Sequence, residues 1–424
     1  MYEHLTYGDK LQSLVTEVEQ QITNVHKQIE ANIDSNQYRV LASFQQNRVS
    51  ESHFIPSTGY GYDDLGRDTL ENIYAEVFGG EAGLVRPQII SGTHAISIAL
   101  FGILRPGDEL LYITGKPYDT LEEIVGIRGN GVGSLKEFQI DYNSVDLLSN
   151  GNPDFEAIAA SIKPNTKMIG IQRSKGYATR PSFTIAEMKE MIEFVKELKE
   201  DVIVFVDNCY GEFVEQQEPC HVGADLMAGS LIKNPGGGLA KTGGYIVGKE
   251  ELVTACSYRM TSPGIGAEAG ASLYSLQEMY QGFFLAPHIV GQSLKGAVFT
   301  AAMLEKLGMN SSPKWNTKRT DLIQSVQFDD KEKMVAFCQA IQFASPVNSH
   351  VTAYPNYMPG YEDDVIMAAG TFIQGASIEL TADGPIRPPY VAYVQGGLTY
   401  SHVKIAVCMA VNRLLEQKLI TIEV

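Results

Sequence analysis

Between residues 85 and about 247, short apolar runs alternate with stretches of helical spacing. A strand that is buried on both faces reads as a continuous apolar run, and the helices between such strands cover the faces of a parallel sheet. The alternation therefore predicts an α/β large domain with a mostly parallel sheet. The expected strands are Val85–Ile90, Glu109–Ile113, Met168–Gln172, Val202–Asp207 and Gly244–Val247, and the expected helices are Thr93–Leu104, Tyr118–Ile127 and Ile185–Leu198.

The segments on either side of this alternation predict two further parts of the fold. Apolar residues at helical spacing indicate a helix over residues 10–32, and a second helix is expected to start at a cap, Asp34 or Ser35. Beyond residue 277 the pattern changes to long helices and short strands separated by prolines, which indicates a smaller α+β domain. The helices expected there are His288–Leu307, Lys331–Phe343 and Ser401–Gln417, and the expected division is an N-terminal helical arm (residues 1–50), a large domain (residues 51–287) and a smaller C-terminal domain (residues 288–424).

The charge balance excludes some classes of binding partner, and the cysteine count indicates the cellular compartment. The formal net charge is −17 and the pI is about 4.9, and such a chain repels nucleic acid and anionic membranes. No apolar run reaches membrane-spanning length, the histidines show no metal-ligand spacing, and the scattered cysteines, without a Cys-x-x-Cys pair, are typical of a reducing compartment. We therefore expect a cytoplasmic protein with a small-molecule partner and with no metal, nucleic acid or membrane.

Two polar residues stand at the ends of expected buried strands. Lys233 follows such a strand in the run Gly223–Pro235, just before a glycine-rich segment, Gly236–Gly238. Asp207 closes the apolar strand that starts at Val202, and a carboxylate there costs free energy unless it is paired. A lysine that forms a Schiff base with pyridoxal 5′-phosphate (PLP), and an aspartate that holds the pyridine nitrogen protonated, would account for both residues. The pair therefore indicates PLP-dependent amino-acid chemistry.

Alternatives to this interpretation stay open. Lys175, and Lys241 just after the glycine run, are rival lysines, and Asp207 with Asn208 can simply cap a turn. The glycine run would also suit the nucleotide site of a Rossmann-like dehydrogenase, although it lacks Gly-x-Gly-x-x-Gly and comes late in the chain.

The other cofactor contacts are expected near the same edge of the sheet. Ser91, Gly92 and Thr93 open an apolar helix after a strand, and a helix N-terminus with a glycine and two hydroxyls suits a phosphate group. The same residues would also serve as an ordinary N-cap. Ser230 is a further candidate for the phosphate. Tyr118 follows the next strand, where an aromatic ring can stack on a pyridine or lie half-buried at the surface.

The ordered set of these motifs resembles the Cys/Met-metabolism PLP enzymes, which include cystathionine lyases and methionine γ-lyase. The resemblance covers essentially the whole chain: Ser91-Gly92-Thr93, Tyr118, Asp207-Asn208 and Ser230-x-x-Lys233 with Gly243-Gly244 behind follow one another in the family's order. Two segments are more closely similar to the methionine γ-lyase-related branch, whose bacterial members are often labelled aluminium-resistance proteins. They are Tyr60-Gly61-Tyr62-Asp63-Asp64-Leu65-Gly66-Arg67-Asp68 and Ser230-Leu231-Ile232-Lys233-Asn234-Pro235-Gly236-Gly237-Gly238.

The resemblance implies a fold-type I enzyme that works as a homodimer or homotetramer with active sites shared between subunits. A tyrosine near the start of the large domain then reaches the neighbour's phosphate, and Tyr60, or failing that Tyr62, holds the comparable place. The family usually has an arginine where Tyr62 stands, so Arg67 is a candidate to replace it. The smaller domain supplies the arginine that binds the substrate carboxylate, which implies Arg387, with Arg173 as the alternative.

The function expected from residues and resemblance together is a PLP-dependent carbon–sulfur lyase acting on a sulfur-containing amino acid such as methionine, cystathionine or cysteine. Lys233 would remove the Cα proton, and Lys233 and Tyr118 are the candidate acid–base groups for β- or γ-elimination. Alternatives are γ-replacement, aldol cleavage or transamination at the same site, and a non-catalytic stress protein that keeps the fold. Cys209 is expected to be a small buried residue and not a nucleophile.

Overall fold

The structure is a computed structural model that describes residues 2–359 and 361–422. The chain forms two compact units, which are Asn36–Leu285, and Met1–Ser35 together with Ala286–Val424. The helical arm expected over residues 1–50 is thus divided between the two units.

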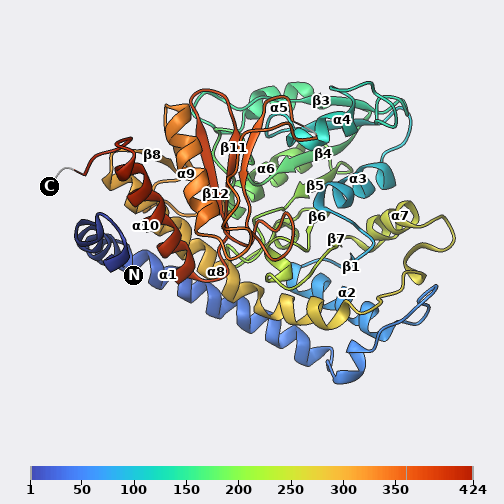
Figure 1. The fold of residues 1–424 in the computed structure, drawn as a ribbon. Coiled ribbons are helices and arrows are strands. Elements are labelled where there is room, and N and C mark those ends of the chain that lie inside the picture. The colour runs from blue at the N-terminus through green and yellow to red at the C-terminus, as the bar shows by residue number, and fades with distance from the viewer. Residues whose placement is uncertain (1, 360, 423–424) are drawn as a thin grey trace. The chain divides into compact units, whose positions relative to one another are not determined.

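A seven-stranded sheet organises the unit Asn36–Leu285 (Figure 1). Its strand order is β1-β7-β6-β5-β4-β2-β3, with β2 to β6 parallel and β7 antiparallel to both β1 and β6. The expected mostly parallel sheet is therefore confirmed. The strands are β1 (Ala82–Arg86), β2 (Glu109–Tyr112), β3 (Asp141–Ser144), β4 (Thr166–Gln172), β5 (Ile203–Asp207), β6 (Leu226–Ser230) and β7 (Gly244–Gly248).

The parallel strands end at one edge of the sheet and carry their last residues there together. In the β4–β5 pair, Gln172 is opposite Asp207, and Asp207 is in turn opposite Ala228 on β6. Ser230 closes β6, three residues before Lys233. Gln172, Asp207 and Ser230, which are separated by 35 and 23 positions in the sequence, are in this way placed at one edge of the sheet.

Helices cover the sheet because their apolar stripes match its apolar faces. Alternate strand residues such as Leu110, Met168 and Phe205 join one hydrophobic core with the buried residues of α3 and α7. Ser91 caps α3, and Thr184 forms a capping box at the start of α6. The helices are α2 (Leu65–Phe78), α3 (Gly92–Ile103), α4 (Glu122–Val125), α5 (Phe155–Ser161), α6 (Ile185–Leu198) and α7 (Glu250–Met260), with 3-10 turns η2 (Glu51–Phe54), η3 (Asp119–Leu121), η4 (Pro219–Val222), η5 (Asn234–Gly236) and η6 (Gly266–Glu268).

The other unit contains a five-stranded antiparallel sheet of order β10-β11-β12-β9-β8. Helices α9 and α10 pack against each other, and α9 also contacts the sheet. The expected smaller α+β architecture is confirmed. The elements are η1 (Tyr2–His4), β8 (Asn310–Ser312), β9 (Gln324–Gln327), α9 (Lys331–Phe343), β10 (Val365–Ala368), β11 (Thr381–Pro385), β12 (Val391–Gln395) and α10 (Tyr400–Glu416), while α1 (Gly8–Gln46) and α8 (Leu276–Lys306) have residues in both units.

Some element boundaries differ from the sequence-based expectations. Helix α1 continues through Asp34 and Ser35, because Ile29, Asn36 and Val40 keep the buried helical spacing across them. Strand β1 ends at Arg86, before Pro87, which cannot donate to a ladder.

The helix expected over Tyr118–Ile127 is reduced to η3 and α4, which ends at Gly126 in the left-handed region (φ 88°). The expectations also missed α2, β3, α5 and α7, which the structure adds to this unit.

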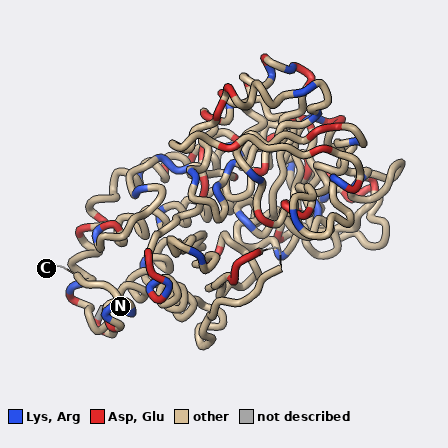
Figure 2. Tube along the Cα trace, turned by 90° about the horizontal axis from the view of Figure 1, so that it is seen from above, with Lys and Arg blue, Asp and Glu red and all other residues tan. Residues whose placement is uncertain are grey.

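Charged side chains of both signs are interspersed along the trace, as Figure 2 shows, although acidic residues are in excess. An anionic ligand therefore needs donors gathered at its own site. Across the residues that the structure covers, no helix has the length and apolar character to cross a membrane.

Candidate active site

Lys233, Asp207, Tyr118 and Thr93 line one cavity at the carboxyl edge of β4, β5 and β6. The cavity has a volume of about 410 Å³ including its open mouth. Neither rival lysine is among its lining residues: Lys175 is buried between the lining residues Ser174 and Gly176, and the exposed Lys241 pairs with Glu278 at 2.5 Å. The structure therefore brings together the lysine, the aspartate, the tyrosine and one hydroxyl that the sequence singled out.

The segment that carries Lys233 is fixed to the turn after β5. The side-chain amide of Asn234, the next residue, donates to the backbone oxygens of Tyr210 at 3.0 Å and Glu212 at 2.9 Å. The ammonium nitrogen of Lys233 lies 3.9 Å from the centre of the Tyr210 ring. Burial lowers the pKa of Lys233, but Cys209, Tyr210 and Asp207 outweigh it, so that its pKa is raised above the ordinary value.

Asp207 is the buried carboxylate of the cavity. It is 6% exposed, and its Oδ1 accepts the backbone N–H of Cys209 at 3.1 Å. Burial raises the pKa of Asp207 above its ordinary value, while the charge of Lys233 opposes that rise. A second cation in the cavity would therefore be stabilised by this carboxylate.

The N-terminus of α3 forms a close-fitting wall near Lys233. A Cβ atom on Gly92 would lie 3.1 Å from the sulfur of Cys209 and 3.2 Å from Cβ of Ser230, so a glycine lets these two side chains pack closely on the start of α3. Ser91 accepts the backbone N–H of His94 at 3.0 Å, and the hydroxyls of Thr93 and Thr120 are 3.0 Å apart. Backbone N–H groups and hydroxyls are thus concentrated where an anion can bind.

Tyr118 lies half-buried at the start of η3 and forms part of the cavity wall. Its ring packs on the backbone of Gly176, where an added Cβ would lie 2.7 Å from Cδ2 of Tyr118. The ring of Tyr177 is 6.1 Å away, centre to centre. These contacts hold the Tyr118 ring at the cavity, as stacking on a planar ligand requires.

Gln172 is a cavity residue that the sequence reasoning missed. It ends β4 directly opposite Asp207, and its amide nitrogen donates to the backbone oxygen of Ser174 at 2.7 Å. Its buried Oε1 has no hydrogen-bond partner. The sequence feature that could have identified Gln172 is its position at the end of a strand that is next to the strand of Asp207.

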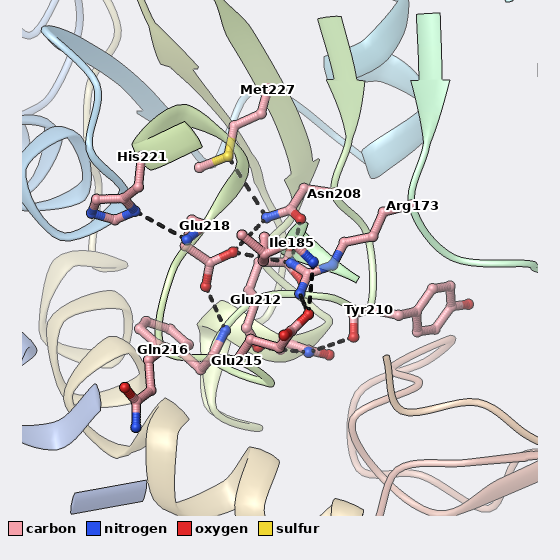
Figure 3. Close-up of polar contacts among 12 residues, drawn as sticks. Arg173, Ile185, Asn208, Tyr210, Glu212, Glu215, Gln216, Glu218, His221 and Met227 are labelled. Atoms are coloured by element: carbon pink, nitrogen blue, oxygen red, sulfur yellow. Dashed lines mark hydrogen bonds and ion pairs between the residues drawn. The ribbon is translucent and has the colours of Figure 1, made fainter. Parts of the chain in front are cut away.

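Arg173, the alternative carboxylate ligand that the sequence left open, is buried and is not among the lining residues of the cavity. Its fully buried guanidinium lies 3.2 Å from Glu218 and 3.6 Å from Glu215, and donates to Asn208 at 2.8 Å (Figure 3). The charge of Arg173 is therefore used inside the protein, behind the strand ends.

Tyr60 lies at the surface of the same unit and does not line the cavity. It is 73% exposed, and its ring stacks on that of Tyr62 with centres 5.4 Å apart. Arg67 does not reach outward beside them, because its buried guanidinium donates to the backbone oxygens of Gly61 and Gly270. Arg67 therefore shapes the turn that presents the two tyrosines.

Arg387 belongs to the other unit and lies just beyond β11. Its side chain is 48% exposed and pairs with Asp363 at 3.1 Å. An exposed guanidinium with a single surface carboxylate as its ion-pair partner can exchange that partner for a ligand at little cost.

Comparison with known proteins gives one consistent result. A family model described as methionine gamma-lyase matches residues 11–415. An uncharacterized protein of Bacillus subtilis, YnbB, is 76% identical over 421 residues, which are 99% of this chain and 100% of that protein.

Solved structures agree with this match. A candidate cystathionine beta-lyase involved in aluminum resistance, from Listeria monocytogenes, is 70% identical with a TM-score of 0.94, and the match covers 95% of this chain and 99% of that one. A carbon-sulfur lyase involved in aluminum resistance, from Clostridium novyi, is 48% identical with a TM-score of 0.92 over 96% of both chains.

The fold extends to more distant proteins. The pyridoxal-5′-phosphate dependent protein YhfS of Escherichia coli is 15% identical with a TM-score of 0.61, covering 90% of this chain and 96% of that one. At this identity the likeness shows the fold alone, and it confirms the expected fold-type I architecture.

Proposed function

Because this chain belongs to the methionine gamma-lyase family, we propose that it is a PLP-dependent carbon–sulfur lyase that acts on a sulfur-containing amino acid. The observation that carries the proposal is the single cavity lined by Lys233 and Asp207, beside the N-terminus of α3. A lysine, a buried carboxylate and an anion site are the three protein groups that this cofactor requires.

The residues present fit the cofactor. The N-terminus of α3, where Gly92 lets Cys209 and Ser230 pack closely and the hydroxyls of Thr93 and Thr120 are 3.0 Å apart, would offer backbone N–H groups and hydroxyls to a phosphate group. Asp207 would pair with the pyridine nitrogen, and Tyr118 would pack against the ring face. Gln172 would hold the ring edge through its unpartnered Oε1.

The chemistry then divides between cofactor and protein. When bound, the cofactor supplies an electron sink for the charge that develops at Cα of the substrate. The Lys233 amine, once released, takes the proton from Cα and can return it to Cβ or to the leaving thiol, with Tyr118 as the second acid–base group. Arg387 would bind the substrate carboxylate in a bidentate pair. Either β- or γ-elimination, followed by hydrolysis of the released imine by one water molecule, would yield a thiol, a 2-oxo acid and ammonia.

We further propose that the protein is a homodimer or homotetramer with shared active sites. The exposed, stacked Tyr60 and Tyr62 are held outward by Arg67, and such an aromatic surface favours contact with a second copy. In that arrangement Tyr60 would reach the partner's phosphate site. Aldol cleavage, γ-replacement and transamination at the same cavity are the alternative activities.

The visible absorption spectrum of the purified protein tests the proposal. The parent should absorb as a lysine-linked cofactor and should release thiol and 2-oxo acid from a sulfur-containing amino acid, whereas Lys233→Ala should lack both properties. Lys241→Ala is the matched control and should behave as the parent, since Lys241 is exposed outside the cavity. A parent that stays colourless with added PLP would overturn the proposal. A spectrum without thiol release, but with amino transfer or aldol cleavage, would reassign the reaction.

A further inference from the structure

Glu212 is a buried carboxyl group that the proposed mechanism does not use. It lies in the turn after β5 with no exposed surface (0%), near the Arg173 cluster (Figure 3). The hydroxyl of Tyr245 donates to its Oε1 at 2.7 Å, while its buried Oε2 has no hydrogen-bond partner among the residues that the structure describes. One neutral donor and one unpartnered oxygen are a poor environment for a negative charge.

The guanidinium of the neighbouring cluster is engaged elsewhere, and the charge of Lys233 acts on Glu212 without forming an ion pair. Arg173 pairs with Glu218 and Glu215, and among the described residues Glu212 itself takes part in no ion pair. A carboxylate buried without a cation is strongly disfavoured and holds its proton instead. A protonated carboxyl group turns the unpartnered oxygen into a hydroxyl donor. The geometry therefore favours the neutral acid.

Glu212 contacts the strand and the turn that position Lys233. A Cβ atom on Gly229 would lie 2.5 Å from Oε1 of Glu212, so this carboxyl group packs directly on β6, four residues before the lysine. The backbone oxygen of Glu212 accepts the side-chain amide of Asn234, the residue after the lysine, at 2.9 Å. A charge on Glu212 would therefore act on Lys233 through a short, dry path.

The groups that face Glu212 come from several elements. They are Tyr245 on β7, Tyr74 on α2, Cys209 in the turn after β5, Glu218 before η4, and Lys233 after β6. Burial raises the pKa of Glu212 to about 8, with Glu218 adding to the rise and the Tyr245 hydroxyl, the residue's own N–H and Lys233 opposing it. The raised pKa of Glu212 agrees with its burial beside one neutral donor, since both favour the protonated acid.

We propose that Glu212 is a positioning residue for Lys233, held as a neutral carboxylic acid that fastens the turn after β5 to β6 and β7 without adding a charge. Asp207 is then the anion that faces the lysine. Once Glu212 loses its proton, its negative charge holds Lys233 as the ammonium form and limits the amine at alkaline pH. The assignment of Lys233 as the reacting residue rests on the proposed function, whereas the protonation of Glu212 does not.

Infrared difference spectroscopy of the full chain tests the protonation directly. At pH 6.5, a value chosen below the midpoint expected near pH 8, subtracting the Glu212→Gln spectrum from that of the parent should leave the carbonyl stretch of a protonated carboxylic acid. Glu215→Gln is the matched control and should leave only carboxylate bands, because Glu215 accepts the Ile185 N–H and faces Arg173. A pure carboxylate difference at Glu212 would overturn the proposal.

The rate of acetylation of Lys233 tests the effect of the Glu212 charge on the lysine. The cofactor is first removed with hydroxylamine, the chain is treated with a trace amount of acetylating reagent, and the product is quantified by peptide mass spectrometry. Above pH 9 the Glu212→Gln chain should react roughly tenfold faster at Lys233 than the parent, since removing the negative charge should lower the pKa of the lysine by about one unit, which is a tenfold rise in free amine. Equal rates in both chains would refute the coupling. The acetylation rate needs no bound PLP. It therefore tests the effect of Glu212 on Lys233 even if the proposed function is wrong.

Tyr245→Phe keeps the test available if Glu212→Gln does not fold. Removing the hydroxyl takes away the donor to Oε1 and should move the ionisation of Glu212 to higher pH, so the carboxylic acid band persists further into the alkaline range. An acid band that disappears at the same pH as in the parent would contradict the assigned contact.

Discussion

Replacing Arg173 with methionine removes the cation of a buried cluster and leaves its carboxylates behind. Glu215 then loses the guanidinium that lies 3.6 Å from its Oε1, and Glu218 keeps the more distant Arg39, whose Nη2 lies 3.9 Å from Oε1. Breaking a buried ion pair from one side costs about 3–5 kcal/mol, since an uncompensated charge remains. At roughly 2–4 °C per kcal/mol for a unit of this size, the melting temperature should fall by about 6–20 °C.

The assay is a thermal melt of the parent, Arg173→Met and the double variant Arg173→Met with Glu218→Gln. The double variant should recover part of the loss, because a neutral amide at position 218 still accepts the N–H of Phe213. An Arg173→Met chain that melts within about 2 °C of the parent, yet binds its amino acid far more weakly, would refute the structural role and restore Arg173 as a carboxylate ligand.

Three further changes give expectations of different kinds. Asp207→Asn should keep the fold but lower turnover by about 10²-fold or more, measured at saturating substrate, because an amide stabilises the pyridinium poorly. Arg387→Ala should raise KM by about 10–100-fold with a smaller change in kcat, and an unchanged KM would argue for another carboxylate ligand. Asp64→Asn should flatten the acid side of the stability curve. Burial raises the pKa of Asp64, but the hydroxyls of Ser272 and Ser57 outweigh it and lower the pKa, so its stabilisation is present above pH 3.8 and disappears as the pH falls. Melts between about pH 3 and pH 6 would check this.

The residues that the sequence located best are those whose position follows from strand direction. Asp207 and Lys233 lie 26 positions apart, yet both line one cavity, because β5 and β6 are parallel and end at the same edge. Apolar runs identify such strands, and a polar residue just beyond each run is then placed without any knowledge of packing.

What the sequence could not provide depends on partners that are distant in the chain. Arg173 follows a strand just as Asp207 does, so the pattern alone does not distinguish a ligand-binding arginine from a buried one. Its orientation is decided by Glu218, 45 positions later, in a turn without regular periodicity. Gln172 was missed for a related reason, since its role follows from the register that places it opposite Asp207.

Helix boundaries were uncertain where a local signal competed with tertiary packing. Asp34 and Ser35 are common capping residues, but the buried Asn36 donates to the backbone oxygens of Phe213 and Glu215, which holds the helix in place across them. The hydrogen bonds of Asn36 to the turn of Phe213 and Glu215 therefore prevail over the capping propensity of the two residues.

The burial of Cys209 determines how reactive its thiol is. Its thiol is 7% exposed, and burial raises its pKa well above the ordinary value, so the reactive thiolate is disfavoured. The sulfur would be 3.1 Å from a Cβ at Gly92, which leaves room for a small side chain and little more. Its backbone N–H meanwhile fixes Oδ1 of Asp207. A cysteine here is therefore a packing and positioning element between Asp207 and the N-terminus of α3, and in the proposed function the reacting groups are Lys233 and the ligand.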